Sequence, residues 1–181
     1  MNASFFMGFC FEMIVAYSRN HGIGIKNQLP WTIPSDLKRF KKLTEHSVVI
    51  MGKNTFVSIP DKYKPLTNRI NIVLTSNPNQ SCFELYKNTP NLFIINVDKL
   101  FSILQQFKKK RMFIIGGRQI YDLFLPQVKI IHATCVYKNF YDCDTFLDMD
   151  RIKSDFVVAL ATPFMWSPEE ECNYKYITLT R

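Results

Sequence analysis

The chain has 181 residues, of which 47% are hydrophobic and 21% charged, and its formal net charge at pH 7 is +8. This length and composition are typical of one globular domain, and no apolar run reaches the roughly 20 residues that a membrane-spanning helix needs. Five scattered cysteines without a Cys-x-x-Cys pair, and three isolated histidines, argue against a disulfide framework and a structural zinc site. The basic charge leaves nucleic acids, acidic membrane surfaces and small polyanions open as partners.

The N-terminus carries an apolar stretch, ASFFMGFCF, that ends at Glu12. It has no basic residues before it and no small-residue cleavage site after it, so it does not have the pattern of a signal peptide. The scattered, unpaired cysteines favour a reducing compartment, and we expect the protein in the cytoplasm. Met7 and Met13 are alternative starts of the chain.

Apolar runs and helical patterns alternate along the first two thirds of the chain. Runs rich in Ile, Val and Phe predict buried strands at residues 13–17, 47–51, 70–75, 92–96 and 112–115. Helices are predicted between them at 34–44, 53–59, 98–107 and 118–125, the third capped by Asp98. This alternation is typical of an α/β fold with a largely parallel sheet. After Pro126 only strands follow, at 129–137, 156–161 and 174–180, which predicts an antiparallel edge with residues 162–173 as a hairpin loop.

The helix predicted at residues 34–44 contains an unusual acid. Pro34 suits its first turn. At about 100° per residue, Asp36 falls in the middle of the apolar sector. That sector also holds Leu37, Phe40, Leu43 and Thr44, and the opposite, solvated face holds Lys38, Arg39, Lys41 and Lys42. An acid directed into a core marks Asp36 as a candidate functional residue.

Glycines follow two of the predicted strands and precede helices, at Gly52 and at Gly116–Gly117. Each is either a simple tight turn or a close approach of the backbone to a phosphate at a helix N-terminus. The full G-x-G-x-x-G dinucleotide motif is absent. Ligands of open α/β sheets bind at the carboxyl ends of the strands, where both turns are expected.

With these residues in view, the chain resembles the dihydrofolate reductase family from Met13 to its last strand. The matching segments follow the family's order: GIGIKNQLPW, PSDLKRFK, VIMGKNTFVSIP, PLTNRINIVLT, IIGGRQIY and DCDTFLD. The resemblance implies a single α/β domain with a central mixed, mostly parallel sheet. About eight strands are expected, with an antiparallel C-terminal edge and about four flanking helices.

The resemblance implies NADPH-dependent reduction of 7,8-dihydrofolate to 5,6,7,8-tetrahydrofolate, by hydride transfer to C6 with protonation at N5, in one-carbon metabolism and thymidylate synthesis. Because no side chain donates a hydride, such a reduction requires a nicotinamide cofactor. Asp36 would bind the pterin N3 and 2-amino groups and favour the protonated substrate, the N5 proton arriving through water.

The matching motifs imply which residues of this chain have the family's functional roles. Those implied in catalysis are Leu29, Trp31, Asp36, Tyr121 and Thr134, with Thr134 hydrogen-bonded to Asp36. Those implied in substrate binding are Ile14, Val15, Asp36, Leu37, Phe40, Ile59, Leu66, Arg69 and Ile115. Those implied in cofactor binding are Ala16, Ile23, Gly24, Gly52, Lys53, Asn54, Thr55, Ser58, Leu74, Thr75, Ser76, Gly116, Gly117, Arg118, Gln119, Ile120 and Tyr121. No metal ligand is expected.

Some of these residues keep an ordinary structural alternative. Trp31 would hold a water near Asp36 or is a core tryptophan. Arg69 would bind the glutamate α-carboxylate of the substrate or is a surface arginine. Residues 22–30 would form a mobile loop that closes over the cofactor, and Gly116–Gly117 a cis peptide.

NADPH is expected rather than NADH. The segments MGKNT and VLTSN supply Lys53 and the hydroxyls of Thr75 and Ser76, and neither contains an acid. A 2′-phosphate needs such donors, whereas the 2′-hydroxyl of NADH is bound by an acid.

Three features depart from the family pattern. Residues 1–12 have no counterpart in a minimal reductase, so the resemblance implies an N-terminal extension at residues 1–12, dispensable for chemistry, and one domain at residues 13–181. Arg118 stands where a small residue is usual and faces either the pyrophosphate or solvent. Phe56 replaces a tryptophan.

Three alternatives to the main interpretation remain at this point. A reductase of riboflavin biosynthesis shares the fold and the glycine pair but lacks the LPW motif followed by the acid. A nucleic-acid-binding protein would use the lysine blocks, which lack interleaved aromatic residues. The chain is also compatible with the reductase half of a thymidylate synthase fusion. We expect a monomer that binds dihydrofolate and antifolate inhibitors, with no obligate nucleic acid and no membrane.

Overall fold

The computed structural model describes residues 8–181, so most of the predicted N-terminal extension lies outside the described residues. The chain divides into two compact units. The first contains Thr44–Gln127 together with the segment ending at Phe11, and the second contains Glu12–Leu43 and Val128–Arg181. Within residues 8–181 no helix has the length and apolar character needed to cross a membrane.

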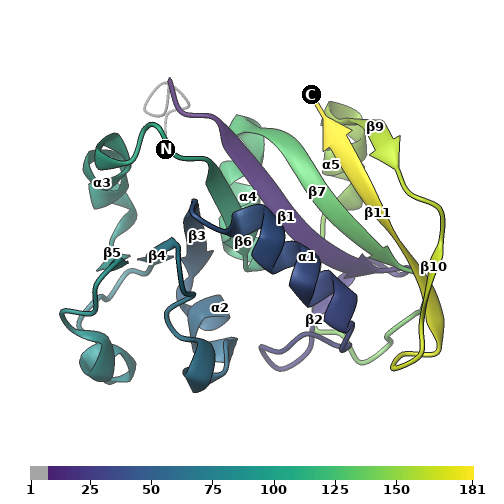
Figure 1. The fold of residues 1–181 in the computed structure, drawn as a ribbon, viewed down its shortest axis with the longest axis horizontal. Helices are drawn as coiled ribbons and strands as arrows, with labels where there is room; N and C mark the ends of the chain where they lie inside the picture. Colours follow the sequence, from purple (N-terminus) through teal and green to yellow (C-terminus); the bar gives the residue numbers. More distant parts are fainter. Residues whose placement is uncertain (1–7) are drawn as a thin grey trace. The chain divides into compact units, whose positions relative to one another are not determined.

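The first unit is built on four parallel strands in the order β6-β3-β4-β5. These strands are β3 (Val48–Gly52), β4 (Ile70–Leu74), β5 (Leu92–Ile95) and β6 (Met112–Gly116). Its α-helices are α2 (Lys53–Ser58), α3 (Leu100–Gln106) and α4 (Arg118–Phe124), joined by the 3₁₀ turns η2 (Asp61–Tyr63), η3 (Ser81–Tyr86), η4 (Val97–Lys99) and η5 (Leu125–Gln127). Figure 1 shows α2 directly after β3. Residues 48–51 of β3 are completely buried, as expected for a parallel strand covered on both faces.

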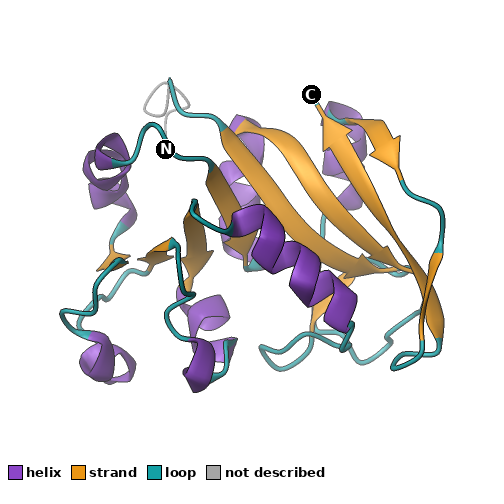
Figure 2. Ribbon diagram, in the orientation of Figure 1, coloured by secondary structure: helices purple, strands orange, loops and turns teal. Residues whose placement is uncertain are grey.

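The second unit is mainly antiparallel. Its strands are β1 (Phe11–Ser18), β2 (Gly22–Gly24), β7 (Val128–Val136), β8 (Thr145–Phe146), β9 (Val157–Ala161), β10 (Met165–Ser167) and β11 (Cys172–Thr180), and its helices are α1 (Pro34–Thr44) and α5 (Met149–Asp155). Strand β11 pairs antiparallel with β7, β9 and β10. Short strands β2 and β8 form a separate small sheet. In Figure 2, α1 runs in nearly the same direction as the long strands of this unit.

The predicted elements are all present, within a few residues of their expected ends. The strand predicted at residues 92–96 is not buried as expected, because all of β5 is only half-buried. Three further details were wrong. Asp98 does not cap α3, because it lies inside η4 and Lys99 is the N-cap. Residues 162–173 are not only a loop, since they contain β10. Helix α5 was missed although Asp148 caps it by accepting a hydrogen bond from the Arg151 N–H (3.1 Å). The sequence did not predict strands β2 and β8, because they are too short to show the alternation of apolar and polar residues that marks a strand.

Strand β1 begins inside the predicted extension. Phe11 is fully buried, and its ring lies 5.2 Å from that of Phe124 in an edge-to-face contact. Glu12 Oε2 lies 2.6 Å from Nε2 of His132. Residues 11 and 12 therefore contribute to the folded domain.

We expect deletion of residues 2–7 to leave kcat within a few-fold of the full chain. Deletion of residues 2–12 should instead lower the melting temperature, because losing a buried Phe typically costs about 3–5 kcal/mol. Steady-state kinetics and thermal unfolding of both truncations check this. A shorter truncation that folds but loses activity would place residues 2–7 in the active site or in an obligate interface.

Candidate functional site

Asp36 lies in the first turn of α1 and faces the strands of the second unit. The Thr134 hydroxyl of β7 donates a hydrogen bond of 2.6 Å to Asp36 Oδ1, the contact expected from the sequence. Burial raises the pKa of the Asp36 carboxyl, while the Thr134 hydroxyl and the positive charge of Arg39 lower it. The Asp36 carboxyl is thus partly shielded from water and accepts a hydrogen bond from Thr134.

Two tyrosines of β11 complete the surroundings of this acid. Tyr176 stands opposite Thr134 in the β11–β7 register. The Tyr174 hydroxyl lies 2.7 Å from Ser35 Oγ at the start of α1. The guanidinium of Arg39 lies 4.3 Å from the centre of the Tyr176 ring. Arg39 is therefore not on a freely solvated face, which corrects the helical-wheel prediction.

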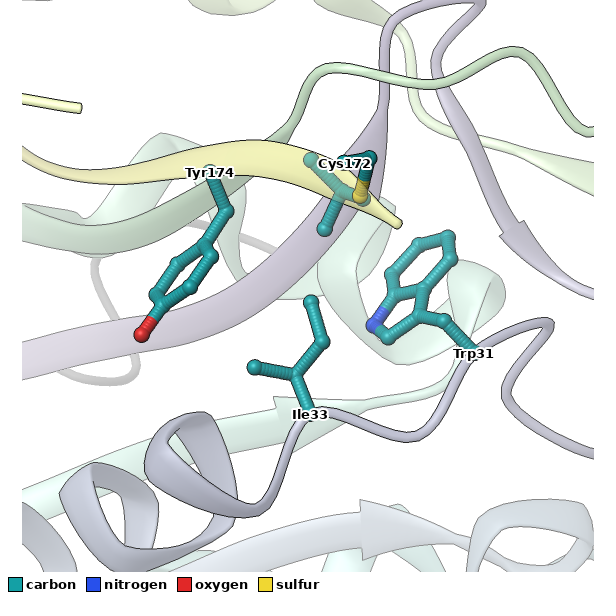
Figure 3. Packing of buried hydrophobic residues seen from close by; sticks show 5 residues of the cluster. Trp31, Ile33, Cys172 and Tyr174 are labelled. Atoms are coloured by element: carbon teal, nitrogen blue, oxygen red, sulfur yellow. The ribbon is translucent and has the colours of Figure 1, made fainter. Parts of the chain in front are cut away.

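Trp31 is in the core and also carries an unsatisfied donor. It packs with Ile33, Val136, Cys172 and Tyr174 in one buried cluster, four of whose members are labelled in Figure 3. Its Nε1 is buried and has no hydrogen-bond partner within the described chain. Buried N–H groups almost always have a partner, so this donor is suited to a water or a ligand.

The connection before α1 is held by a residue that the sequence did not indicate. Glu170, which precedes β11, accepts a hydrogen bond of 2.6 Å from the Thr32 N–H. Lys138 donates to the Glu170 backbone oxygen (2.9 Å). Glu170 thus fixes the segment that leads into α1.

Residues 22–30 are anchored at one end to the segment around β8. The Lys26 N–H donates a 2.7 Å hydrogen bond to Asp144 Oδ2. A Cβ on Gly22 would lie 2.4 Å from Cys143 Sγ, so only glycine fits there. Leu29 is 51% exposed. Ile23 and Gly24 belong to β2, and no pattern in the sequence indicated the contact with Asp144.

In the first unit, the two glycine turns lie side by side. A Cβ on Gly52 would lie 3.1 Å from Ile120, and one on Gly117 would lie 3.1 Å from the Thr55 hydroxyl. Gly116 has φ +121°, and the Gly116–Gly117 peptide is cis. A Cβ on Gly116 would lie 3.1 Å from the Tyr121 hydroxyl. Side chains at these three positions would press on Ile120, Tyr121 or Thr55, so glycine allows the two turns to pack closely against α2 and α4.

Lys53 and Thr75 are also neighbours, since they directly follow Gly52 and Leu74, which pair in the β3–β4 register. Thr75 Oγ1 accepts a 3.2 Å hydrogen bond from the Asn77 N–H. The structure therefore brings a cation and a hydroxyl to adjacent strand ends. The further cofactor candidates Asn54, Ser58, Ser76 and Gln119 are exposed.

Arg69 is buried, with only 7% of its surface exposed, and is not a surface arginine. Its Nη1 donates to Thr44 Oγ1 and its Nε to the Thr67 carbonyl, both at 3.0 Å. Burial lowers the pKa of Arg69, and Glu45 raises it. The Asn71 side chain accepts a hydrogen bond from the Leu66 N–H and donates one to the Leu66 carbonyl. These two bonds fix the backbone of Leu66.

The remaining candidates have simpler environments. Arg118 Nε pairs with Asp122 at 2.5 Å. Leu37 is 52% exposed and not in the core, contrary to its predicted sector. Ile14 and Val15 are buried in β1, and the half-buried candidates are Ala16, Phe40, Ile59 and Ile115.

A parallel sheet with close-fitting glycine turns at its strand ends is typical of a nucleotide-binding α/β enzyme. The comparisons make this class specific. The family model "Dihydrofolate reductase" matches residues 10–181, and the chain belongs to the dihydrofolate reductase family.

Curated relatives agree over most of the chain. The dihydrofolate reductase of Ureaplasma parvum is 37% identical over 139 residues, which cover 77% of this chain and 82% of the relative. That of Drosophila melanogaster is 34% identical, covering 75% and 78%. A bifunctional dihydrofolate reductase-thymidylate synthase of Arabidopsis thaliana is 35% identical over 76% of this chain, which spans 26% of that longer protein.

A solved structure confirms the predicted fold class. Dihydrofolate reductase from Enterococcus faecalis, complexed with NADP(H) and RAB-propyl, superposes with a TM-score of 0.76 at 26% identity. The match covers 97% of this chain and 98% of the other. The fold is thus the α/β fold of dihydrofolate reductases.

Proposed function

We propose that this chain reduces 7,8-dihydrofolate to 5,6,7,8-tetrahydrofolate with NADPH. Family membership supports the reaction, and the observation that carries it is Asp36, a partly buried acid fixed by Thr134. Such an acid can bind the 2-amino and N3 groups of a pterin, and its negative charge favours the protonated form of the substrate.

NADPH, when bound, supplies the hydride for C6. The residues of the first unit fit such a group, because Lys53 and Thr75 follow adjacent strand ends and the glycines at Gly52 and Gly116–Gly117 directly precede helices α2 and α4. Tyr121 and Thr55 border these turns. Lys53, with Thr75 and Ser76, would bind the 2′-phosphate.

The second unit would bind the pterin and control its water. Trp31 Nε1, which is buried and unpartnered within the described residues, would hold a water near Asp36. Ile14, Val15, Leu37 and Phe40 would contact the ring. Residues 22–30, held by Asp144, would exclude bulk water during hydride transfer.

Outside the second unit, Ile59, Leu66 and Ile115 would contact the rest of the substrate. Arg69 would bind its glutamate carboxylate.

Isotope transfer tests the proposed reaction. NADPH deuterated at the transferred position of nicotinamide C4, incubated with the protein and dihydrofolate, should give tetrahydrofolate labelled at C6. Mass spectrometry and NMR identify the product. Product without label at C6 would refute direct hydride transfer.

We expect Lys53→Ala to weaken NADPH binding by about 1–3 kcal/mol, the usual value for a hydrogen bond to a charged group. Binding of NADH should barely change, and higher ionic strength should reduce the difference. Lys109→Ala, which removes an exposed cation from the segment after α3, is the matched control. Equal losses for NADPH and NADH in a titration would show that Lys53 does not bind the 2′-phosphate.

Three features of organisation are also proposals: a cytoplasmic location, a monomeric state and binding of antifolate inhibitors. Bifunctional relatives from Arabidopsis thaliana and Paramecium tetraurelia support the alternative that a thymidylate synthase domain is joined to this domain. Sedimentation of the isolated chain tests the monomer. The size of the natural protein tests the fusion.

A further inference from the structure

Arg39 lies in a different environment from the lysines on the same helix. It is half-buried on α1, and its guanidinium is stacked on the Tyr176 ring at 4.3 Å. The lysines at positions 38, 41 and 42 of the same helix are exposed. The planar, delocalised guanidinium is suited to stacking on an aromatic face, whereas a lysine ammonium is a compact, strongly hydrated charge. The stacking therefore fixes the positive charge of Arg39 near the sheet.

The buried end of Arg39 is incompletely satisfied. Its Nη1 is buried and has no hydrogen-bond partner within residues 8–181. Removing a guanidinium N–H from water without a partner is unfavourable unless another interaction compensates. A nearby negative charge provides that compensation.

Asp36 is the acid that faces this charge. It lies three residues before Arg39 on α1, a spacing that puts two side chains on neighbouring positions of a helix. Thr134, which donates to Asp36, stands opposite Tyr176, on which Arg39 stacks. The two charged groups are thus held by neighbouring residues of paired strands.

Among the described residues, the other groups that contact Asp36 or its partners are uncharged donors and phenols. Thr134 on β7 is a neutral donor, the Tyr174 hydroxyl lies next to Ser35, and burial raises the pKa of Tyr176 on β11. The attraction between Asp36 and Arg39 is reciprocal. It lowers the pKa of Asp36 against the effect of burial, and it raises that of Arg39.

We propose that Arg39 is a positioning residue that, fixed by stacking on Tyr176, keeps the partly buried Asp36 carboxylate charged at neutral pH. Its importance for catalysis rests on the proposed function, in which Asp36 binds the substrate as a carboxylate. The interaction acts through the field, because no hydrogen bond or ion pair joins the two side chains in the described part of the chain.

The test is a titration of Asp36 by carboxyl ¹³C NMR in the protein without ligands, with Asp36→Asn used to assign the signal. Arg39→Met keeps the length of the side chain and removes the charge. It should raise the midpoint of the Asp36 titration by about one pH unit, a tenfold change in the ionisation constant. Arg39→Lys should restore only part of the difference, because it keeps the charge but loses the stacking on Tyr176 that fixes it. Lys42→Met removes an exposed charge of α1 and should leave the midpoint in place.

An Asp36 titration midpoint that is unchanged in Arg39→Met would overturn the inference. Arg39 would then only pack against Tyr176. An equal rise in Lys42→Met would also overturn it, since net charge alone would then explain the effect. In the proposed reaction, the rate of Arg39→Met should fall most at pH values between the two titration midpoints. In that range Asp36 is protonated in the variant and charged in the wild type. Because the NMR titration needs no turnover, its outcome stands apart from a failure of the reductase assay.

Discussion

Asp36→Asn is expected to reduce dihydrofolate roughly 10²–10⁴-fold more slowly than the wild type near neutral pH, the usual scale for a positioned acid–base group. The carboxylate is held by Thr134, and an amide cannot supply its negative charge. The rate should partly recover at low pH, where solvent protonates the substrate. Single-turnover kinetics across a pH series measure both effects. A variant within a few-fold of the wild type at neutral pH would leave Asp36 a structural helix-end acid.

The same substitution provides its own folding control. Because burial raises the pKa of Asp36 above its ordinary value of 3.8, the folded protein retains this proton to higher pH than the unfolded chain. The stability that the protonated acid contributes is present below 3.8 and is lost as pH rises through the folded pKa. Asp36→Asn should therefore melt at least as high as the wild type at neutral pH, with a smaller difference in acid. A lower melting temperature at neutral pH would indicate that the activity loss includes misfolding.

Arg69→Leu is expected to raise the KM for dihydrofolate by a factor equivalent to about 2–4 kcal/mol, the value of a partly buried, charge-assisted bidentate contact. The guanidinium is buried and oriented by Thr44 and the Thr67 carbonyl, so its charge is presented in one geometry. A pterin substrate without the glutamate tail should be reduced almost normally.

Arg69→Lys is the matched control for this prediction, since it keeps the charge and loses the planar pair of donors. It should fall between Arg69→Leu and the wild type in KM. If the tail-less pterin loses as much as dihydrofolate, Arg69 supports the fold and does not bind the tail.

Secondary structure was predictable where the pattern was long and apolar. Three of the four parallel strands of the first unit, β3, β4 and β6, are buried runs rich in Ile, Val and Phe, and α1 begins and ends at the predicted residues. Helix α5 has only seven residues, too few to show a helical period, and its N-cap Asp148 alone did not indicate a helix. Strand β10 is three residues long and depends on pairing with β11, which periodicity does not detect.

The candidate site was predictable at the motifs but not around them. The sequence indicated Asp36 through its direction, and Thr134 only through the family resemblance. Helical angles placed Arg39 with the solvated lysines, because they describe where a side chain starts and not where a long, stacking group ends. Glu170 and Asp144 act on backbone N–H groups distant in sequence, so no local pattern marks them.

The most direct measurement of the central claim follows the near-ultraviolet absorbance of NADPH after the protein is mixed with NADPH and dihydrofolate. We expect a loss of absorbance that requires dihydrofolate, proceeds much more slowly with NADH, and nearly disappears in Asp36→Asn at neutral pH. Folded protein that gives no dihydrofolate-dependent loss of absorbance would contradict it.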